Sequence, residues 1–278
     1  MNEKNVIIAG VPRSGTTLTC HLLNKARNTV ALNEPFRAST LSELGDNGAI
    51  CLKIAKFFKK SRKSILTDGT AISKSLDGEI PDNIIGSTRG DNGFREKISN
   101  TKGVIHIDKP LPDDFLLCIK QVAIFAAILD GLVQHFPCYA VMRNPFGVLM
   151  SWNSITLPYR KGRVEQAEVL NKELARALDC IDDQYDRQLY LLSWFYERTN
   201  QFIPRERVLH YEETIGSGGK SLRVIAPEAE ALDEPLKSRN SNKLYNQELK
   251  QFLGEKLLKS DGAYWEYYSK ESVEALLH

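Results

Sequence analysis

Residues 6–23, VIIAGVPRSGTTLTCHLL, constrain the fold of this chain more than any other stretch. An apolar run ends in Gly10, a loop bounded by Gly10 and Gly15 follows, and a segment with helical character comes next. A short, continuous apolar run is typical of a strand buried on both faces of a parallel sheet. The stretch therefore predicts a strand, a tight loop, and a helix whose N-terminus faces the loop.

The rest of the chain alternates strands with helices. Apolar runs predict further strands at 29–35, 114–120, 137–143 and 207–211. Helical spacing predicts helices at 15–26, 47–61, 121–136 and 144–155. It also predicts two helices within 164–201 and a helical C-terminal region. We therefore expect an α/β fold in a single domain, 1–278: a P-loop-like parallel sheet with helices on both faces and a C-terminal helical extension. The polar segment 66–107 is long for a loop, so we expect it to be functional, mobile, or to carry small strands of its own.

Composition limits the class of protein. The 278 residues include 37 Lys and Arg against 35 Asp and Glu, a net charge of +2, so we expect no nucleic-acid partner, and any affinity for an anion must be local. Five widely spaced cysteines without a C-x-x-C pair argue against a disulfide scaffold or a zinc site and favour a reducing compartment. The N-terminus lacks the apolar run of a signal peptide, and no segment approaches the roughly 20 apolar residues of a membrane span, which predicts a soluble, cytoplasmic protein.

The loop at 10–17 has the glycine spacing of a Walker A motif, G-x-x-x-x-G-K-[ST], but Thr16 replaces the lysine. Backbone N–H groups and the helix dipole converge on one anion in a loop of this shape, and Thr16 and Thr17 add hydroxyl donors. Arg13 can supply a planar cation from the other side of the anion. The missing lysine removes the charge that would stabilise a transferring terminal phosphoryl group. A plain glycine-rich turn between strand and helix is the alternative.

Four motifs, taken in chain order, resemble those of the sulfotransferases that use 3′-phosphoadenosine-5′-phosphosulfate (PAPS). GVPRSGTTL resembles the family's 5′-phosphosulfate loop, and LLCIK resembles the strand that carries a lysine, here Lys120, toward the sulfuryl group. YAVMRNPFGVLMSW resembles the 3′-phosphate motif, with Arg143 and Ser151 at the family's spacing, and RVLHYEE resembles the strand whose tyrosine, here Tyr211, lies by the adenine. The resemblance implies PAPS as donor, adenosine 3′,5′-bisphosphate (PAP) as product and no metal. It also implies nucleotide contacts from Pro12, Arg13, Ser14, Gly15, Thr16, Thr17, Arg143, Ser151 and Tyr211.

The chemistry of the donor agrees with these positions. PAPS carries a 5′-phosphosulfate and a separate 3′-phosphate, so a protein that binds it needs two anion sites about one nucleoside apart. The loop supplies the first site, and Arg143 and Ser151, beside the helix that opens near Asn144, supply the second. A solvent-facing Arg143 with a carboxylate partner and a Ser151 bonded to its own helix are the alternatives.

Sulfuryl transfer to a hydroxyl needs a base for the proton of the acceptor and cations for the leaving phosphate. Small-molecule cytosolic sulfotransferases place a histidine two residues after the strand lysine, but Lys120 is followed by Gln121 and Val122. The tyrosylprotein and heparan-type enzymes instead use a glutamate after the first helix, and Glu34 in VALNEPF occupies that place.

We therefore predict Glu34 as the general base, with Arg13 and Lys120 as the cations that stabilise the leaving phosphate. A structural salt bridge from Glu34 to Arg13 or Arg37, and an exposed Lys120, are the alternatives. His106 is the competing base.

The glutamate favours a carbohydrate or glycolipid acceptor, with a peptide tyrosine or a small molecule as alternatives. We expect the segment 66–107 and the basic residues Arg160, Lys161 and Arg163 to frame the acceptor cleft, although a solvated charged loop would explain the latter. The stretch of Lys237, Ser238 and Arg239 lies where family members bring a C-terminal loop over the nucleotide.

Two other functions compete with this prediction. One is an ATP-dependent P-loop phosphotransferase, which requires a Mg²⁺-binding aspartate at a strand end. The other is a nucleotide-binding module without turnover.

Overall fold

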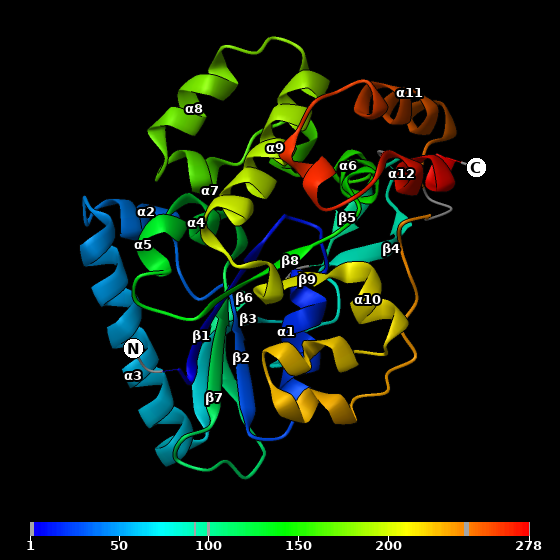
Figure 1. Cartoon of the computed structure of the whole chain (residues 1–278). Helices are drawn as coiled ribbons and strands as arrows, with labels where there is room; N and C mark the ends of the chain where they lie inside the picture. The colour runs from blue at the N-terminus through cyan, green and yellow to red at the C-terminus, as the bar shows by residue number, and fades with distance from the viewer. Residues whose placement is uncertain (1–2, 92, 99–100, 242–244, 278) are drawn as a thin grey trace.

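The centre of the fold is a five-stranded parallel sheet in the order β2-β7-β1-β8-β9, flanked by helices (Figure 1). The computed structural model describes residues 3–91, 93–98, 101–241 and 245–277. The strands of the sheet are β1 (Asn5–Gly10), β2 (Thr29–Asn33), β7 (Leu116–Lys120), β8 (Cys138–Met142) and β9 (Val208–His210). The predicted α/β class is therefore confirmed.

The chain winds in two directions from the middle of this sheet. It crosses from β1 to β2 through α1 (Thr16–Lys25), and from β7 over β1 to β8 through α4 (Val122–Ala127) and α5 (Leu129–Leu132). Right-handed crossovers in opposite directions place their helices on opposite faces of a sheet. The direction reverses between β1 and β8, and ligands of such sheets bind outside the carboxyl ends of the strands at that point.

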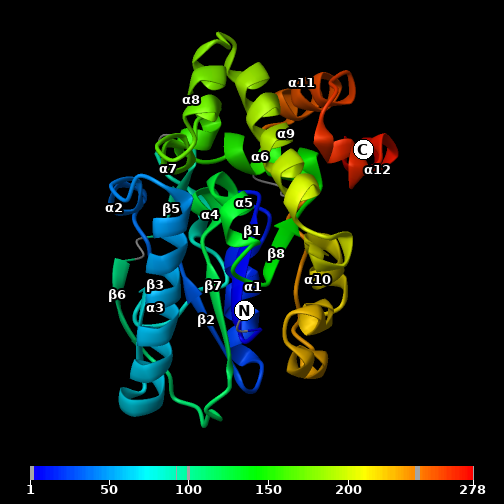
Figure 2. The same ribbon diagram turned by 60° about the vertical axis from the view of Figure 1, so that its left-hand side comes forward.

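The remaining helices cover the sheet and extend the chain at its C-terminal end. They are α2 (Ala38–Ser42), α3 (Asn47–Asp68), α6 (Pro145–Asn153), α7 (Glu165–Glu168), α8 (Lys172–Asp179), α9 (Gln184–Phe202), α10 (Tyr211–Gly216), α11 (Gln247–Leu258) and α12 (Lys270–Leu277). In Figures 1 and 2, α3 lies on one side of the sheet and α10 on the other.

In three stretches the predicted helices differ from the observed ones. The backbone of Ile128 (φ −117°, ψ 22°) leaves the helical region, so the helix predicted over 121–136 is divided into α4 and α5. Residues 164–201 hold three helices rather than two. α3 continues to Asp68 because Ile65 is buried, and Gly69 in the left-handed conformation ends it.

The polar segment 66–107 carries small strands of its own. β3 (Thr70–Ser75) pairs antiparallel with β6 (Thr101–His106), and β4 (Ile85–Arg89) pairs antiparallel with β5 (Arg95–Lys97). The backbone N–H of Asn33, the last residue of β2, donates to Ser73 Oγ at 2.9 Å. This contact holds the β3–β6 hairpin beside the carboxyl edge of the central sheet.

Apolar side chains fill the space on both faces of the central sheet. All five residues of β2 are buried, as expected of a parallel strand covered on both sides. Cys118 and Cys138 lie in this core as small hydrophobic side chains, and all five cysteines are free. No helix in the described ranges combines the length and the apolar character needed to cross a bilayer.

Candidate functional site

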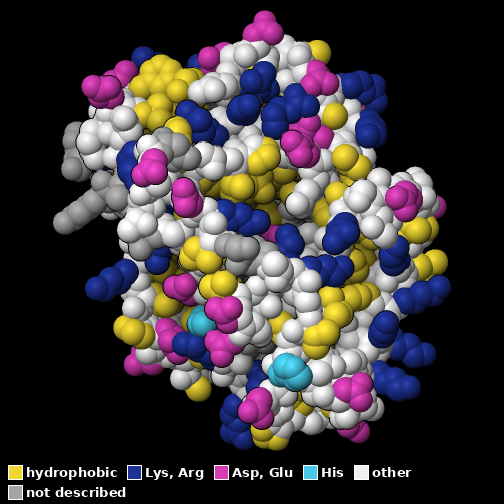
Figure 3. Space-filling model, turned by 180° about the vertical axis from the view of Figure 1, so that it is seen from behind, with side chains coloured by type: hydrophobic (Ala, Val, Ile, Leu, Met, Phe, Trp, Pro, Cys, Tyr) yellow, Lys and Arg dark blue, Asp and Glu magenta, His cyan; other side chains and the backbone are white. Residues whose placement is uncertain are grey.

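A cavity of about 430 Å³ lies at the carboxyl edge of the central sheet. Its walls come from the β1–α1 loop, the ends of β2, β7 and β8, the polar segment, residues 157–166 and residues 235–239. Seven basic side chains line it (Arg13, Lys74, Lys97, Lys120, Arg143, Lys237, Arg239), against three acidic ones (Glu34, Asp82, Glu165). In Figure 3, Lys and Arg side chains gather around the middle of the molecule next to a hydrophobic patch. A nearly neutral chain therefore holds a local excess of positive charge.

The loop between β1 and α1 directs backbone donors into this cavity. Gly10 has a φ of 139°, and a Cβ there would lie 2.4 Å from the carbonyl oxygen of Val141, so the loop packs directly on β8. Among the hydrogen bonds of the described residues, none is donated by the backbone N–H of Gly15, Thr16 or Thr17. These three donors, at the positive end of the α1 dipole, are available to an anion.

Ser14 and Ser151 support the site from outside the cavity lining. Ser14 is fully buried, and its hydroxyl donates to the carbonyl of Val141 at 2.7 Å. Ser151 is 1% exposed, and its Oγ accepts from Arg13 Nε at 3.2 Å. The other predicted nucleotide contacts, Pro12, Arg13, Gly15, Thr16, Thr17, Arg143 and Tyr211, all line the cavity.

Arg13 extends from the loop in a left-handed backbone conformation, with φ 73°. Besides its contact with Ser151, its Nη2 donates to Asn83 Oδ1 at 3.1 Å. Burial, followed by the charges of Arg143 and Arg95, lowers the pKa of Arg13 to about 10. The side chain remains cationic at neutral pH, surrounded by like charges.

Arg143 directly follows β8 and is 4% exposed. Its Nε donates to Asn240 Oδ1 at 2.7 Å, and its Nη1 donates to the carbonyl of Arg13 at 2.9 Å. Its Nη2 is buried and has no hydrogen-bond partner in the described part of the chain. A buried guanidinium nitrogen without an acceptor is costly, so this atom marks a place for an anion. The arginine is therefore neither solvent-facing nor, among the described side chains, paired with a carboxylate.

Tyr211 joins the loop between β1 and α1 to the C-terminal part of the chain. It is the first residue of α10, its ring lies 4.7 Å from Cζ of Arg143, and a Cβ at Gly15 would lie 2.7 Å from its Cδ2. Its hydroxyl accepts from the backbone N–H of Arg239 at 3.0 Å. Lys237 and Arg239 thus line the cavity, whereas Ser238 does not.

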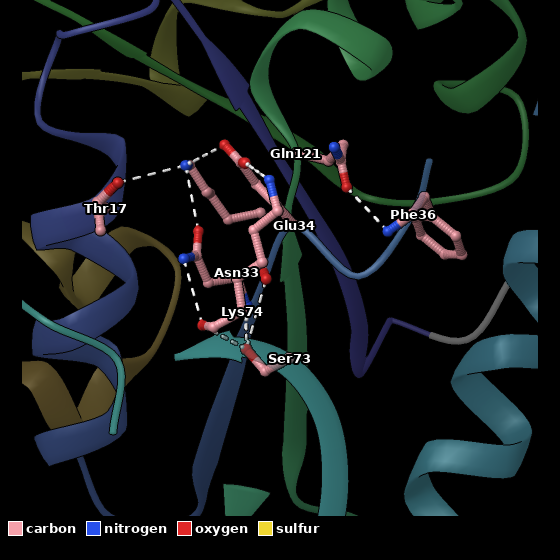
Figure 4. Close-up of polar contacts among 8 residues, drawn as sticks. Thr17, Asn33, Glu34, Phe36, Ser73, Lys74 and Gln121 are labelled. Atoms are coloured by element: carbon pink, nitrogen blue, oxygen red, sulfur yellow. Dashed lines mark hydrogen bonds and ion pairs between the residues drawn. The ribbon is translucent and has the colours of Figure 1, made fainter. Parts of the chain in front are cut away.

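Glu34 lies between two lysines where β2 and β7 end side by side (Figure 4). Lys120 Nζ donates to its Oε1 at 2.8 Å, and Lys74 Nζ donates to its Oε2 at 2.8 Å. The alternative predicted from the sequence is a salt bridge from Glu34 to Arg13 or Arg37. Glu34 does form salt bridges, but its partners are Lys74 and Lys120.

The two lysines determine the charge state of Glu34. Burial by itself would raise the pKa of this carboxyl, but the charges and hydrogen bonds of Lys120 and Lys74 lower it to about 2. Lys120 is 2% exposed, which excludes the exposed strand-end lysine, and it also donates to Thr17 Oγ1 at 3.3 Å. Lys120 therefore connects the carboxylate to the N-terminus of α1.

Other predicted contributors lie outside the cavity lining. His106 is exposed at the end of β6. Arg160 stacks on the ring of Phe94 at 4.1 Å, and Arg163 pairs with Glu168 and Asp179. Arg160, Lys161 and Arg163 thus do not line this cavity, whose wall comes from their neighbours Leu157, Pro158, Tyr159 and Val164, and their place at an acceptor cleft stays a prediction.

Comparisons with known proteins leave the family open. No family model matches the chain, and no curated protein matches its sequence. Among solved structures, the chain is similar to sulfotransferase STF9 from Mycobacterium avium, with 16% sequence identity and a TM-score of 0.37. That similarity covers 99% of this chain and 75% of the other, and it is too low to assign a function.

Sequence reasoning missed several residues of the site. Lys74 stands in TAISKS, where apolar and polar residues do not alternate, so no local pattern distinguishes this lysine from the other polar residues of the segment. Asn83 and Asn240 carry no such signal, because they lie in loops brought to the site by contacts with Arg13 and Arg143. In the described ranges, no three His, Cys, Asp or Glu side chains come together as a metal site would require.

Proposed function

We propose that this chain is a PAPS-dependent sulfotransferase that transfers a sulfuryl group to a hydroxyl of a carbohydrate, a glycolipid or a similar acceptor. The observation that carries the proposal is the presence of two anion-binding groups on one cavity. One is the N-terminus of α1 with Arg13, and the other is the buried Arg143 with its unpartnered Nη2. A nucleotide with a 5′-phosphosulfate and a separate 3′-phosphate matches both. The resemblance of the four motifs in chain order points to the same donor.

The residues of the cavity can be assigned to the two ends of this nucleotide. PAPS would supply the activated sulfuryl group. The backbone N–H groups of residues 15–17, the hydroxyls of Thr16 and Thr17, and Arg13 would hold the 5′ end. Arg143 would bind the 3′-phosphate, with Tyr211 beside the adenine, while Ser14 and Ser151 hold the loop and Arg13 in place.

Glu34 would accept the proton of the acceptor hydroxyl. Each of its oxygens accepts a hydrogen bond from a lysine, and the two cations oppose protonation, so loss of either contact would make Glu34 a stronger base. Lys120 lies within reach of Thr17, so an anion at the N-terminus of α1 would compete with Glu34 for it. Movement of Lys120 toward the leaving phosphate would free Oε1 of Glu34 and raise the pKa of the carboxyl.

The transfer would form one bond to sulfur and break another. The acceptor oxygen bonds to sulfur as its proton passes to Glu34, and the bond between sulfur and the bridging phosphate oxygen breaks. Arg13 and Lys120 stabilise the negative charge left on that phosphate. Four of the five free cysteines are buried, and we propose a reducing compartment, the cytoplasm, for the enzyme.

Calorimetric titration with PAP, compared with ATP and Mg²⁺, tests this proposal. We expect PAP to bind with a dissociation constant in the low micromolar range, about −8 kcal/mol, without a metal requirement. Turnover would then be measured with labelled PAPS and a panel of carbohydrate, glycolipid, peptide-tyrosine and small-molecule acceptors. A clear preference for ATP with Mg²⁺ would favour the phosphotransferase, and tight PAP binding without turnover on any acceptor would favour a nucleotide-binding module.

A further inference from the structure

A second arginine near the site is also buried without a partner. Arg95 lies on β5 and is 2% exposed. Its Nε donates to the carbonyl of Gly86 at 3.0 Å, but its Nη2 is buried and unpaired among the described residues. The only other buried guanidinium nitrogen in that state, within the described ranges, is Nη2 of Arg143. An unpaired buried cation is costly, so the position of Arg95 calls for an anion that the protein itself does not supply.

The backbone around Arg95 places it beside the 3′-phosphate motif. Its N–H donates to the carbonyl of Ser154 at 2.8 Å. Ser154 lies three residues after Ser151, which accepts from Arg13, and its hydroxyl donates to the carbonyl of Ser151 at 2.9 Å. Side chains two residues apart on a strand share a face, and Lys97 of the same strand lines the cavity. Arg95 is 2% exposed and does not itself line the cavity, so it lies directly behind the wall to which Lys97 belongs.

Electrostatic coupling agrees with this placement. Burial lowers the pKa of Arg95 and Tyr245 opposes this, while the charges of Arg239 and Arg143 lower the pKa further; Arg95 in turn lowers the pKa of Arg13. These four arginines share one region of the molecule. Within the part of the chain that the structure describes, none of them forms an ion pair with a carboxylate. The charge of this region is thus left for a ligand.

We propose that Arg95 is a second arginine of the anion site around Arg143 and binds the 3′-phosphate of the nucleotide. The polar segment 66–107 would then contribute to the choice of 3′-phosphorylated nucleotides over those that carry only a 5′ group. This inference rests on the proposed function, because it assumes that the cavity binds such a nucleotide.

Two adenosine nucleotides test the inference, one with the 3′-phosphate and one without it. PAP carries the 3′-phosphate, and adenosine 5′-phosphosulfate lacks it. We expect Arg95→Met to weaken PAP binding by about 10- to 100-fold, as for a lost charge-assisted contact, and to change adenosine 5′-phosphosulfate binding by less than about threefold. Arg89→Met is the matched control, because Arg89 is an exposed arginine of the same hairpin, and it should change neither affinity.

Thermal unfolding separates a ligand-binding role from a structural one. Without ligand, Arg95→Met should unfold at or above the wild-type temperature, since it removes an unpaired buried charge, but the increase on adding PAP should be smaller than in wild type. Arg95→Lys, which keeps a charge, should retain part of the PAP preference and serves if the methionine variant does not fold.

Equal loss of both ligands or unchanged PAP affinity would each overturn the role of Arg95. Failure of the wild-type protein to bind PAP would instead overturn the proposed function, so the two failures are distinguishable.

Discussion

Lys120 and Glu34 form an ion pair, with Nζ 2.8 Å from Oε1, where the neighbouring strands β7 and β2 end. The pair exists because parallel neighbours bring the residues after their carboxyl ends together, and the backbone N–H of Glu34 donates to the carbonyl of Lys120 at 2.8 Å. The same lysine touches Thr17 of the phosphate loop. The proposed base and the proposed donor site therefore share one cation.

Glu34→Gln should separate binding from turnover. Gln keeps the shape of the side chain but cannot take the proton of the acceptor, so we expect turnover to fall by roughly 10²- to 10⁴-fold. PAP affinity, measured by calorimetry, should stay within about threefold of wild type. Persistent activity would place the base elsewhere and make His106 the next residue to substitute.

The stability of the protein should depend on Glu34 between about pH 4.5 and pH 2. The pKa of this carboxyl in the folded state, about 2, lies below its ordinary value of 4.5. Its contribution is therefore fully present above pH 4.5 and is lost as the pH falls through the folded pKa. We expect wild type to exceed Glu34→Gln by about 2 kcal/mol in the free energy of unfolding at neutral pH, with the difference shrinking toward pH 2. Denaturant unfolding at several pH values measures it; a constant difference would contradict the ion pairs.

Lys74→Met should shift the acidic limb of the activity profile. Lys74 is one of the two cations that lower the pKa of Glu34, so its removal raises that pKa. We expect the acidic limb of kcat/KM to move to higher pH by about 1 unit. Lys97→Met, which removes a lysine that lines the same cavity, is the control and should leave the limb in place. Identical profiles for both variants would remove Lys74 from the control of Glu34.

Arg143→Ala should weaken PAP binding by one to three orders of magnitude, because the unpartnered Nη2 is the donor proposed for the 3′-phosphate. The KM for PAPS should rise correspondingly. Arg223→Ala, at an exposed arginine paired with Glu230, is the control and should bind PAP as wild type does. Unchanged binding in Arg143→Ala would exclude this residue from the nucleotide site.

Gly15→Ala should impair the phosphate loop beyond the cost of its backbone conformation. Gly15 has φ 93°, and a Cβ there would lie 2.7 Å from Tyr211. Gly78 has a similar φ of 84° but open space around it, so Gly78→Ala measures the conformational cost alone, about 1–2 kcal/mol. We expect Gly15→Ala to lose more stability than this and to bind PAP at least about tenfold more weakly. Equal effects of both substitutions would mean that the contact between Gly15 and Tyr211 is unimportant.

Local patterns in the sequence were sufficient for the main elements of the fold. Some signals act within a few residues, so their structural consequences can be predicted. They are the apolar run before Gly10, the positive φ of Gly10 and Gly15, and the proline at the start of α6. The break at Ile128 has neither glycine nor proline at that position, whereas α8 and α9 begin after Asn171 and Asp183, whose side chains cap the two helices and are a local signal for a helix start.

The sequence by itself determined the parallel α/β fold, the glycine-bounded loop before α1, and the strand-end positions of Glu34, Lys120 and Arg143. Only the tertiary structure decided their partners. Lys74 reaches Glu34 from 40 residues away, and Asn240 reaches Arg143 from 97 residues away. The contact with Lys74 helps to keep Glu34 charged, and the contact with Asn240 orients the side chain of Arg143. The physical reason is that electrostatic interactions depend on distance in space, which no local pattern of residues encodes.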